Sequence, residues 1–321
     1  MKVLQIVKYG ELKDGLSFSE TAKPSINATD ILIETKATGL NPIDYKLVSG
    51  GLKDMVPLDL PSTIGFDVSG VILEKGADVN GFEVGDAVYA RVPQNQMGTV
   101  AEYVAVDGKV VSKKPENISF EEAAGLPLIG LTSIQALERV GLKEGDRVLI
   151  HAGSGGVGSF AIQYAKTKGA YVYTTTSTKN VEWVKALDAD RVIDYKKEDY
   201  KSIVSDLDIV FDTLVGDYTA AAFQVIKEGC KVTNTASVPD EETAAIMGMK
   251  GYKLPENLSK LMDAKSANSK LTGMQPNGEQ LDAISSMVKN GKIKPVIDKV
   301  YPFKEGIDAY SYLATGRAKG K

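Results

Sequence analysis

Hydrophobic and polar residues follow two different rhythms along the chain, and the change falls near Phe120. Before that point, short runs rich in β-branched residues are separated by Gly, Pro, Asn and Asp, which is typical of strands joined by turns. We therefore expect strands at 3–7, 30–39, 66–76, 86–92 and 99–106. From 120 to 141, apolar residues recur at helical spacing, and acidic residues near the start complement the helix dipole. This segment is predicted to be a helix.

Beyond this helix, strand patterns and helix patterns alternate. The predicted strands are 146–153, 170–177, 191–195, 208–215 and 231–236, and the predicted helices are 159–169, 180–189 and 220–229. This order is typical of an α/β fold with a parallel, doubly wound sheet, as in a Rossmann domain. Further along, 277–295 is predicted to be a helix followed by a strand-like return, and 307–321 closes the chain.

These patterns predict two domains, for which 321 residues are enough. We expect a β-rich domain built from 1–122 and 276–321, with a Rossmann domain inserted at 123–275. The stretch 237–271 is predicted to be partly irregular with a short helix. Its methionines Met247, Met249 and Met262 could pack against helices or line an apolar pocket.

Composition and charge exclude several classes of protein. The net charge of -4 argues against nucleic acid or an anionic membrane as partner, because no basic excess exists to neutralise phosphates. Cys230 is the single cysteine, so the chain has no intrachain disulfide and fits a reducing compartment such as the cytoplasm. The N-terminal apolar run is too short for a signal peptide, and no apolar stretch reaches the roughly 18 residues of a transmembrane segment.

A glycine-rich loop is the first candidate for chemistry. Gly153, Gly155 and Gly158 have the spacing G-x-G-x-x-G, directly after a buried strand pattern and before an amphipathic helix. In this context glycines let the backbone approach a pyrophosphate, and the helix N-terminus offers free N–H groups. The alternative is a tight glycine turn without a ligand. We predict a dinucleotide site.

The end of the next predicted strand indicates which dinucleotide binds. Sites for NAD usually have Asp or Glu there to bind the ribose 2′-hydroxyl. This chain has Ser177, Thr178, Lys179 and Asn180 instead, and these side chains suit a 2′-phosphate. We therefore predict NADPH rather than NADH. Tyr195 either packs near the same phosphate or simply ends its strand.

A metal site is not predicted. A catalytic zinc needs several Cys, His or carboxylate ligands, and the chain has one Cys and one His in total. His151 ends the strand before the glycine loop, where a packed side chain is favoured over a catalytic one.

Eight segments occur in order along the chain and together identify a resemblance. They are GLNPIDYK (39–46), TIGFDVSGVI (63–72), FEVGDAVYA (82–90), TVAEYVAV (99–106), AAGLPLIGLTSIQAL (123–137), GDRVLIHAGSGGVG (145–158), PNGEQL (276–281) and ATGRAKGK (314–321). The chain resembles the quinone oxidoreductase branch of the medium-chain dehydrogenase/reductase superfamily. Within it, the chain is similar to plant enone oxidoreductases and chloroplast-envelope quinone oxidoreductase homologues.

The resemblance implies a GroES-like catalytic domain with an inserted Rossmann domain. It also implies NADPH-dependent reduction, without zinc, of an activated C=C bond or a quinone, with a small-molecule enone or quinone as substrate. A homodimer would form by pairing of Rossmann edge strands near 269–274. A non-catalytic NADPH-binding redox sensor or structural protein of the same fold is the alternative. Relatives usually run on past GRAKGK into a final apolar strand, whereas the printed chain stops at Lys321.

Site residues follow from the resemblance by matching motif positions. Asn41 and Asp44 would line the active-site cleft. The mechanism also needs a donor to the substrate oxygen, and the candidates are backbone N–H groups, the nicotinamide ribose hydroxyl, and Lys46 or Tyr45. The cofactor-binding residues would be Lys46, Thr132, Ser154, Gly155, Gly156, Val157, Ser177, Thr178, Lys179, Asn180 and Tyr195. A structural interpretation stays open for Asn41 as a turn residue before Pro42, for Asp44 as a local cap, and for Lys46 as a solvated lysine.

Overall fold

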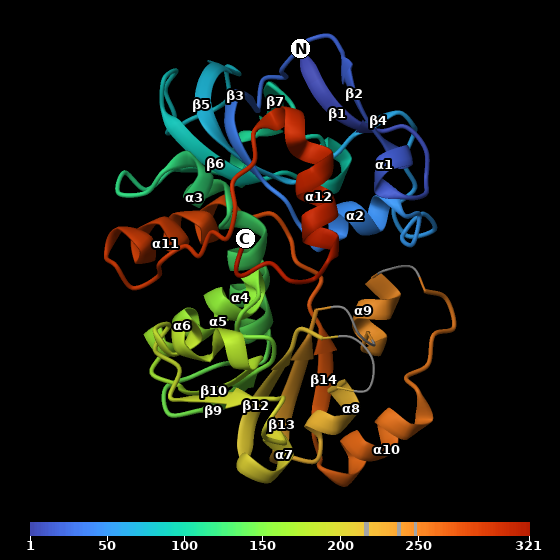
Figure 1. Ribbon diagram of the computed structural model, residues 1–321, viewed down its shortest axis with the longest axis vertical. Helices are drawn as coiled ribbons and strands as arrows, with labels where there is room; N and C mark the ends of the chain where they lie inside the picture. Colours follow the sequence, from blue (N-terminus) through green and yellow to red (C-terminus); the bar gives the residue numbers. More distant parts are fainter. Residues whose placement is uncertain (215–217, 236–238, 247–248) are drawn as a thin grey trace. The chain divides into compact units, whose positions relative to one another are not determined.

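The computed structural model describes residues 1–214, 218–235, 239–246 and 249–321. The chain divides into two compact units (Figure 1). Unit 1 comprises Met1–Leu131, Gln275–Lys319 and Lys321, and unit 2 comprises Thr132–Met274 and Gly320. The division falls within helix α4 (Pro127–Arg139).

Unit 1 is built on two antiparallel sheets, which the β-branched runs of the first third predict. The larger sheet has the order β7-β3-β5-β6-β8, and the smaller has the order β2-β1-β4. Their strands are β1 (Lys2–Ile6), β2 (Leu16–Glu20), β3 (Asp30–Gly39), β4 (Ser62–Thr63), β5 (Asp67–Lys75), β6 (Ala87–Arg91), β7 (Tyr103–Asp107) and β8 (Val111–Lys113). The last residue of β3, the first residue of β5 and the last residue of β6 lie side by side at one end of these strands, because the neighbours are antiparallel.

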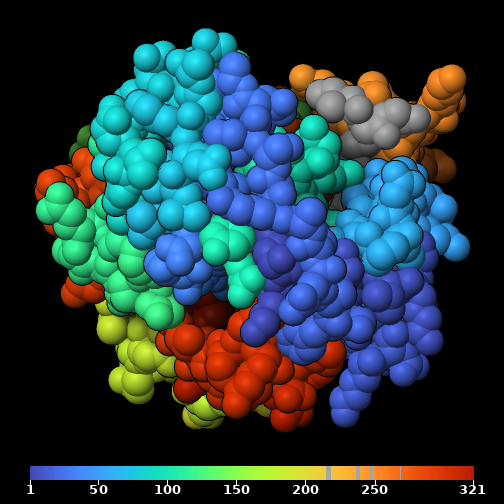
Figure 2. All heavy atoms as spheres, turned by 90° about the horizontal axis from the view of Figure 1, so that it is seen from above, coloured from blue at the N-terminus to red at the C-terminus, as the bar shows by residue number. Residues whose placement is uncertain are grey.

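Both ends of the chain contribute to the core of unit 1. Leu4 and Ile6 of β1 are in one buried cluster with Tyr310 of α12, and in Figures 1 and 2 the blue and red segments lie side by side. The unit's helices are α1 (Leu12–Gly15), α2 (Pro42–Val48), α3 (Phe120–Ala124), α11 (Gly278–Lys289) and α12 (Gly306–Ala314), with short 3-10 turns η1 (Gln94–Gln96), η2 (Gly108–Val110) and η4 (Phe303–Glu305).

The single helix predicted over 120–141 is wrong, because the structure has two helices there. α3 ends at Ala124, and α4 begins at Pro127. Proline has no N–H to continue the bonds of a preceding helix, but its backbone angle suits the first turn of a new one. The break therefore has a local cause at Pro127.

Unit 2 contains six parallel strands in the order β11-β10-β9-β12-β13-β14, and the predicted doubly wound sheet is confirmed. The strands are β9 (Arg147–Ile150), β10 (Tyr171–Thr176), β11 (Arg191–Asp194), β12 (Leu207–Asp212), β13 (Ile226–Asn234) and β14 (Asn268–Leu271). The helices are α5 (Gly156–Thr167), α6 (Val181–Lys185), α7 (Tyr200–Ile203), α8 (Tyr218–Ala222), α9 (Glu241–Ile246) and α10 (Glu256–Ala264), with the 3-10 turn η3 (Thr178–Asn180).

The helix predicted over 220–229 is also too long. α8 ends at Ala222, and β13 already begins at Ile226. Ile226 is buried in the core beside the sheet, and Gly229 has φ of +74°, which a right-handed helix does not allow. Packing therefore overrides the helical spacing of these residues.

The stretch 237–271 contains α9, α10 and β14. Met262 packs against the apolar cluster around Leu258, whereas Met249 is exposed. Met247 lies outside the described residues. In the parts of the chain that the structure describes, helices fall short of the length and apolar character that crossing a bilayer requires.

Candidate cofactor and active site

The glycine loop lies at the position where ligands bind in open α/β sheets. From β9 the chain adds β10 and β11 on one side, and β12 pairs on the other side of β9. Strand order thus reverses at β9, and such switch points form the crevice for dinucleotides. The loop after β9 leads directly into α5, which begins at Gly156.

Close packing requires glycine at two of the three motif positions, Gly153 and Gly158, but not at Gly155. A Cβ at Gly153 would collide with the Thr174 hydroxyl, and one at Gly158 would collide with the backbone carbonyl of Ala152. A Cβ at Gly155 would meet only the Ala152 oxygen, at 3.5 Å, an ordinary contact. The fold therefore does not require glycine at 155, whereas close approach of a phosphate does.

The start of α5 presents backbone N–H groups, although that of Gly155 already donates to the Ala152 carbonyl at 2.9 Å. The first N–H groups of a helix have no partner within it, and the helix dipole favours an anion there. Ser154, Gly155, Gly156 and Val157 form this turn, and Ser133 of α4 donates to the Val157 carbonyl at 3.1 Å. Ser133 is a supporting residue that motif spacing did not reveal. Its neighbour Thr132 is buried in α4.

The residues predicted to bind a 2′-phosphate form the turn that follows β10. Thr178 and Lys179 are exposed, and Ser177 is half-buried. The Asn180 amide donates to the Ser177 hydroxyl at 3.3 Å and accepts from the indole N–H of Trp183 at 3.1 Å. Asn180 therefore stabilises the conformation of the turn. Among the described residues, the Lys179 ammonium has no ion-pair partner.

The end of β11 lies beside this turn, because Asp194 pairs with Thr176 in the parallel register. A hydrogen bond from Thr178 lowers the pKa of the Asp194 carboxyl, so it is ionised at neutral pH. Lys197 lies 3.8 Å from that carboxylate, and Lys196 is exposed beside Tyr195, which is also exposed. Sequence reasoning missed both lysines, although parallel neighbours end at the same sheet edge.

Asn41 and Asp44 lie at the start of α2, and neither has exposed surface. Asp44 Oδ2 accepts from the Asn41 backbone N–H at 2.8 Å and from the Tyr310 hydroxyl at 3.2 Å. Its Oδ1 has no hydrogen-bond partner. Burial raises the pKa of Asp44 to about 7 despite these bonds and the nearby Lys321 ammonium. The role of both residues as cleft-lining groups stays a prediction.

Asn41 also belongs to a buried polar cluster with Asp67 and Lys321. Its Nδ2 donates to the Gly39 carbonyl at 3.2 Å and to Asp67 Oδ2 at 3.0 Å, while its Oδ1 accepts from the Lys321 ammonium. Lys321 Nζ also donates to the Leu40 carbonyl at 3.0 Å and lies 3.6 Å from Asp67 Oδ2.

A further hydrogen bond and a neighbouring cation stabilise Asp67 in that cluster. Its Oδ1 accepts from the Leu128 N–H at the start of α4, at 3.1 Å, and Arg91 is its partner across the β5–β6 ladder. Burial raises the pKa of Asp67, and Lys321, Asn41 and Arg91 counteract that rise. Sequence patterns could not reveal this cluster, since Asp67 lies 26 residues and Lys321 lies 280 residues from Asn41.

Tyr45 and Lys46 follow on α2 and are partly exposed. The described residues supply no hydrogen-bond or ion-pair partner for either side-chain tip. Both therefore retain free donors, unlike Asn41.

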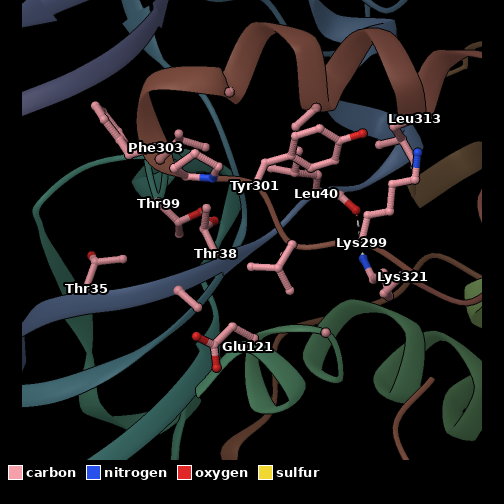
Figure 3. A pocket seen from close by; sticks show the side chains of 18 of the residues that line it. Thr35, Thr38, Leu40, Thr99, Glu121, Lys299, Tyr301, Phe303, Leu313 and Lys321 are labelled. Carbon is pink, nitrogen blue, oxygen red and sulfur yellow. Dashed lines mark hydrogen bonds between the residues drawn. The ribbon is translucent and has the colours of Figure 1, made fainter. Parts of the chain in front are cut away.

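A cavity of about 650 Å³ lies within unit 1 (Figure 3). Thr35 and Thr38 of β3 line it opposite Tyr301 and Phe303, and Lys321 forms part of its wall. The dashed line in Figure 3 marks the bond from Lys321 to Leu40. The cavity thus adjoins the buried cluster.

His151 is a packed residue. Its ring has edge contacts with Tyr200 and Tyr218, with centroids 5.0 and 5.7 Å apart. Burial lowers the pKa of His151 to about 4, so the imidazole is neutral at pH 7. Across the described residues, no three His, Cys, Asp or Glu side chains gather as metal ligands would.

Comparison with known proteins agrees with this architecture. Residues 27–116 match the family "Alcohol dehydrogenase GroES-like domain", and residues 187–321 match "Zinc-binding dehydrogenase". The 2-methylene-furan-3-one reductase of Solanum lycopersicum is 36% identical over 331 residues, covering 100% of this chain and 78% of that protein. The NADPH-dependent alkenal/one oxidoreductase of Arabidopsis thaliana is 36% identical over 313 residues, covering 94% and 74%.

A solved structure extends the similarity to three dimensions. The quinone oxidoreductase from Coxiella burnetii superposes with a TM-score of 0.87 at 33% identity, covering 100% of this chain and 97% of that one. Its similarity and that of the two plant enzymes span both units. The chain therefore belongs to the medium-chain dehydrogenase/reductase superfamily, within its branch of quinone and enone oxidoreductases.

Proposed function

We propose that this chain is an NADPH-dependent oxidoreductase that reduces the C=C bond of an α,β-unsaturated carbonyl, or a quinone, without zinc. The observation that supports it most directly is the loop at Gly155, where the fold leaves a glycine without an internal reason. The plant relatives, which are named for enone and alkenal reduction, support the substrate class.

The residues of unit 2 fit NADPH. The loop Ser154–Val157 and the start of α5 would hold the pyrophosphate, and Ser177, Thr178 and Lys179 would hold the 2′-phosphate. Asn180 supports that turn, Tyr195 and Lys196 lie beside it, and Thr132 is proposed to lie by the nicotinamide. When bound, NADPH supplies a hydride for the β-carbon of the substrate.

The chain's own contribution is to stabilise the charge that develops on the substrate oxygen. A donor aimed at that oxygen lowers the barrier because the enolate gains charge in the transition state. The Asn41 amide has no free N–H, since both are bonded to Gly39 and Asp67. We therefore assign this role to the Tyr45 hydroxyl or the Lys46 ammonium on α2, with solvent as the source of the α-carbon proton.

Zinc-independence is part of the proposal. A catalytic zinc site needs about three protein ligands, and the chain has only His151 and Cys230 as nitrogen and sulfur ligands. Asp44 and Asp67 are already hydrogen-bonded within the buried cluster. Turnover that persists in a chelator, with purified protein free of zinc by elemental analysis, tests this part.

Replacing Lys179 with Ala should raise the Kd for NADPH about tenfold and leave the Kd for NADH unchanged. A charge-assisted bond to the 2′-phosphate is worth about 1.5 kcal/mol, which corresponds to that factor. Fluorescence titration of both cofactors measures the two constants. Lys185→Ala, on the following helix and exposed beside Glu182, is the matched control. An equal loss for both cofactors would contradict a 2′-phosphate contact.

We also propose a homodimer that pairs through β14, the outer strand of the six-stranded sheet. An open sheet edge is normally covered in native proteins, and pairing near 269–274 would cover it. Light scattering should give the mass of two chains, and a monomer at micromolar concentration would argue against this pairing.

The proposed compartment is the cytoplasm. Cys230 is the single cysteine and is buried, so a reducing environment has no disulfide to break. Fractionation of cells that express the natural gene would test the location.

The decisive experiment for the function is NADPH oxidation with a chelator present, against a short alkenal, a furanone-type enone and a quinone. Turnover of either enone supports the proposal, and turnover of the quinone alone narrows it to quinone reduction. Tight NADPH binding without turnover on all three would favour the alternative, a non-catalytic sensor or structural protein.

A further inference from the structure

The Asn41 amide has used both of its hydrogen-bond donors internally, and the Lys321 ammonium has two hydrogen bonds and one ion pair within the same cluster. Asn41 donates its two N–H bonds to Gly39 and Asp67. Lys321 donates to the Leu40 carbonyl and to Asn41 Oδ1, and its ammonium forms an ion pair with Asp67 Oδ2 at 3.6 Å. The Asn41 amide therefore cannot donate to a substrate without giving up a buried partner, and Lys321 is held on the same three residues.

Several hydrogen bonds hold the turn before α2 in place. Lys321 binds the Leu40 carbonyl and the oxygen end of the Asn41 amide, and Asp67 binds the nitrogen end. Asp67 in turn accepts a hydrogen bond from the Leu128 N–H at the start of α4, which connects these contacts to that helix. The side chain of Lys321 is only 7% exposed, and that of Asp67 is fully buried.

We propose that Lys321 is a positioning residue that, together with Asp67, clamps both ends of the Asn41 amide and so fixes the turn from which α2 begins. The inference rests on the proposed function, because α2 bears Tyr45 and Lys46, the groups assigned to the substrate oxygen. A shift of about 1 Å in such groups costs on the order of 100-fold in rate.

The variant Lys321→Met tests the clamp, because it keeps the length of the side chain and removes its donors. We expect kcat to fall ~100-fold, with the KM for NADPH changed less than about threefold. The Lys321 side chain contacts Leu40, Asn41 and Asp67, whereas the bond from this segment to the pyrophosphate loop is made by the Gly320 backbone N–H, which the substitution keeps. The melting temperature should fall as well, because Asp67 keeps a buried charge without its closest cation. Unchanged kcat in Lys321→Met would overturn the proposal.

A double variant separates positioning from stability. Asp67→Asn combined with Lys321→Met removes both charges, so the melting temperature should recover most of its loss. If Lys321 positions Asn41, kcat stays low in the double variant, because the donor to Asn41 Oδ1 is still missing. Recovery of kcat together with the melting temperature would mean that the pair is only structural. Lys299→Met, an exposed lysine over the Tyr312 ring at the same cavity, is the control and should retain full activity.

A crystal structure of Lys321→Met tests, without any measurement of turnover, whether Lys321 holds the Asn41 turn in position. The clamp predicts that the Asn41 amide rotates or that the Leu40–Pro42 backbone moves by about 1 Å or more, the displacement on which the rate argument depends. An unmoved turn would reject the clamp even if the wild-type protein reduces enones. A moved turn in a protein that reduces neither an enone nor a quinone would leave the clamp standing and reject the proposed function.

Discussion

Gly155→Val is expected to weaken NADPH binding at least ~100-fold while unit 2 stays folded. A Cβ at this position meets only the Ala152 oxygen, at 3.5 Å, and φ of -88° suits any residue. The valine side chain would instead occupy the space in front of the α5 N-terminus. Losing two or more charge-assisted bonds of about 1.5 kcal/mol each accounts for the factor. Fluorescence titration measures the Kd, and a thermal melt reports the fold.

Gly158→Val provides the contrast within the same motif. Here a Cβ collides with the backbone carbonyl of Ala152, which cannot move aside as a flexible side chain could. This variant should be poorly soluble or melt well below wild type, by about 10 °C or more for an overpacking cost of a few kcal/mol. Near-native NADPH affinity in Gly155→Val would reject the assignment of that loop to the pyrophosphate.

Asp44→Asn should stabilise the protein at alkaline pH relative to wild type, by a margin that grows as the pH rises from 5 to 8. The pKa of Asp44 is about 7 in the folded chain against 3.8 as its ordinary value. The native state thus binds this proton more tightly, and the stability it contributes is complete below pH 3.8 and lost as the pH rises through 7. Asn cannot ionise, so the difference between variant and wild type should grow by up to about 3 kcal/mol, at 1.36 kcal/mol per pH unit.

The charged and titratable groups that face Asp44 are Asp67, Lys321, Tyr310 and Arg91, and the substitution leaves them in place. Urea unfolding at pH 5, 6, 7 and 8 measures the free energy of unfolding directly. Asp54→Asn, at an exposed carboxylate of the same unit, is the matched control. Parallel pH curves for Asp44→Asn and wild type would mean that Asp44 is ionised in the native protein.

The glycine loop and the sheet that presents it could be predicted because their signals are local. Gly153, Gly155 and Gly158 lie within six residues, and the strand and helix patterns on either side define their context. The break at Pro127 was also readable from the chemistry of proline, although helical spacing on both sides concealed it. The early end of α8 was not readable, since the burial of Ile226 depends on the sheet it joins.

The buried cluster shows why other parts of a site escape sequence reasoning. Asn41 and Asp44 lie in one motif. Asp67, however, accepts a hydrogen bond from the start of α4, and Lys321 lies 280 residues beyond Asn41. No periodicity or spacing connects residues so far apart. Asp194 lies beside Thr178 only because β10 and β11 are parallel neighbours, so this contact becomes visible once the strand order is known.

The discontinuous make-up of unit 1 has a consequence for how the chain matures on the ribosome. Residues 132–274 of unit 2 are continuous and emerge before 275–319 and Lys321, which complete unit 1. Domains generally fold as they are synthesised, so unit 2 can form while the earlier sheets still lack α12 and Tyr310. During that interval Asp44 and Asp67 have no Lys321 to offset their charge, and water must continue to solvate them. Unit 1 is therefore completed late in synthesis, after residues 132–274 of unit 2 have emerged.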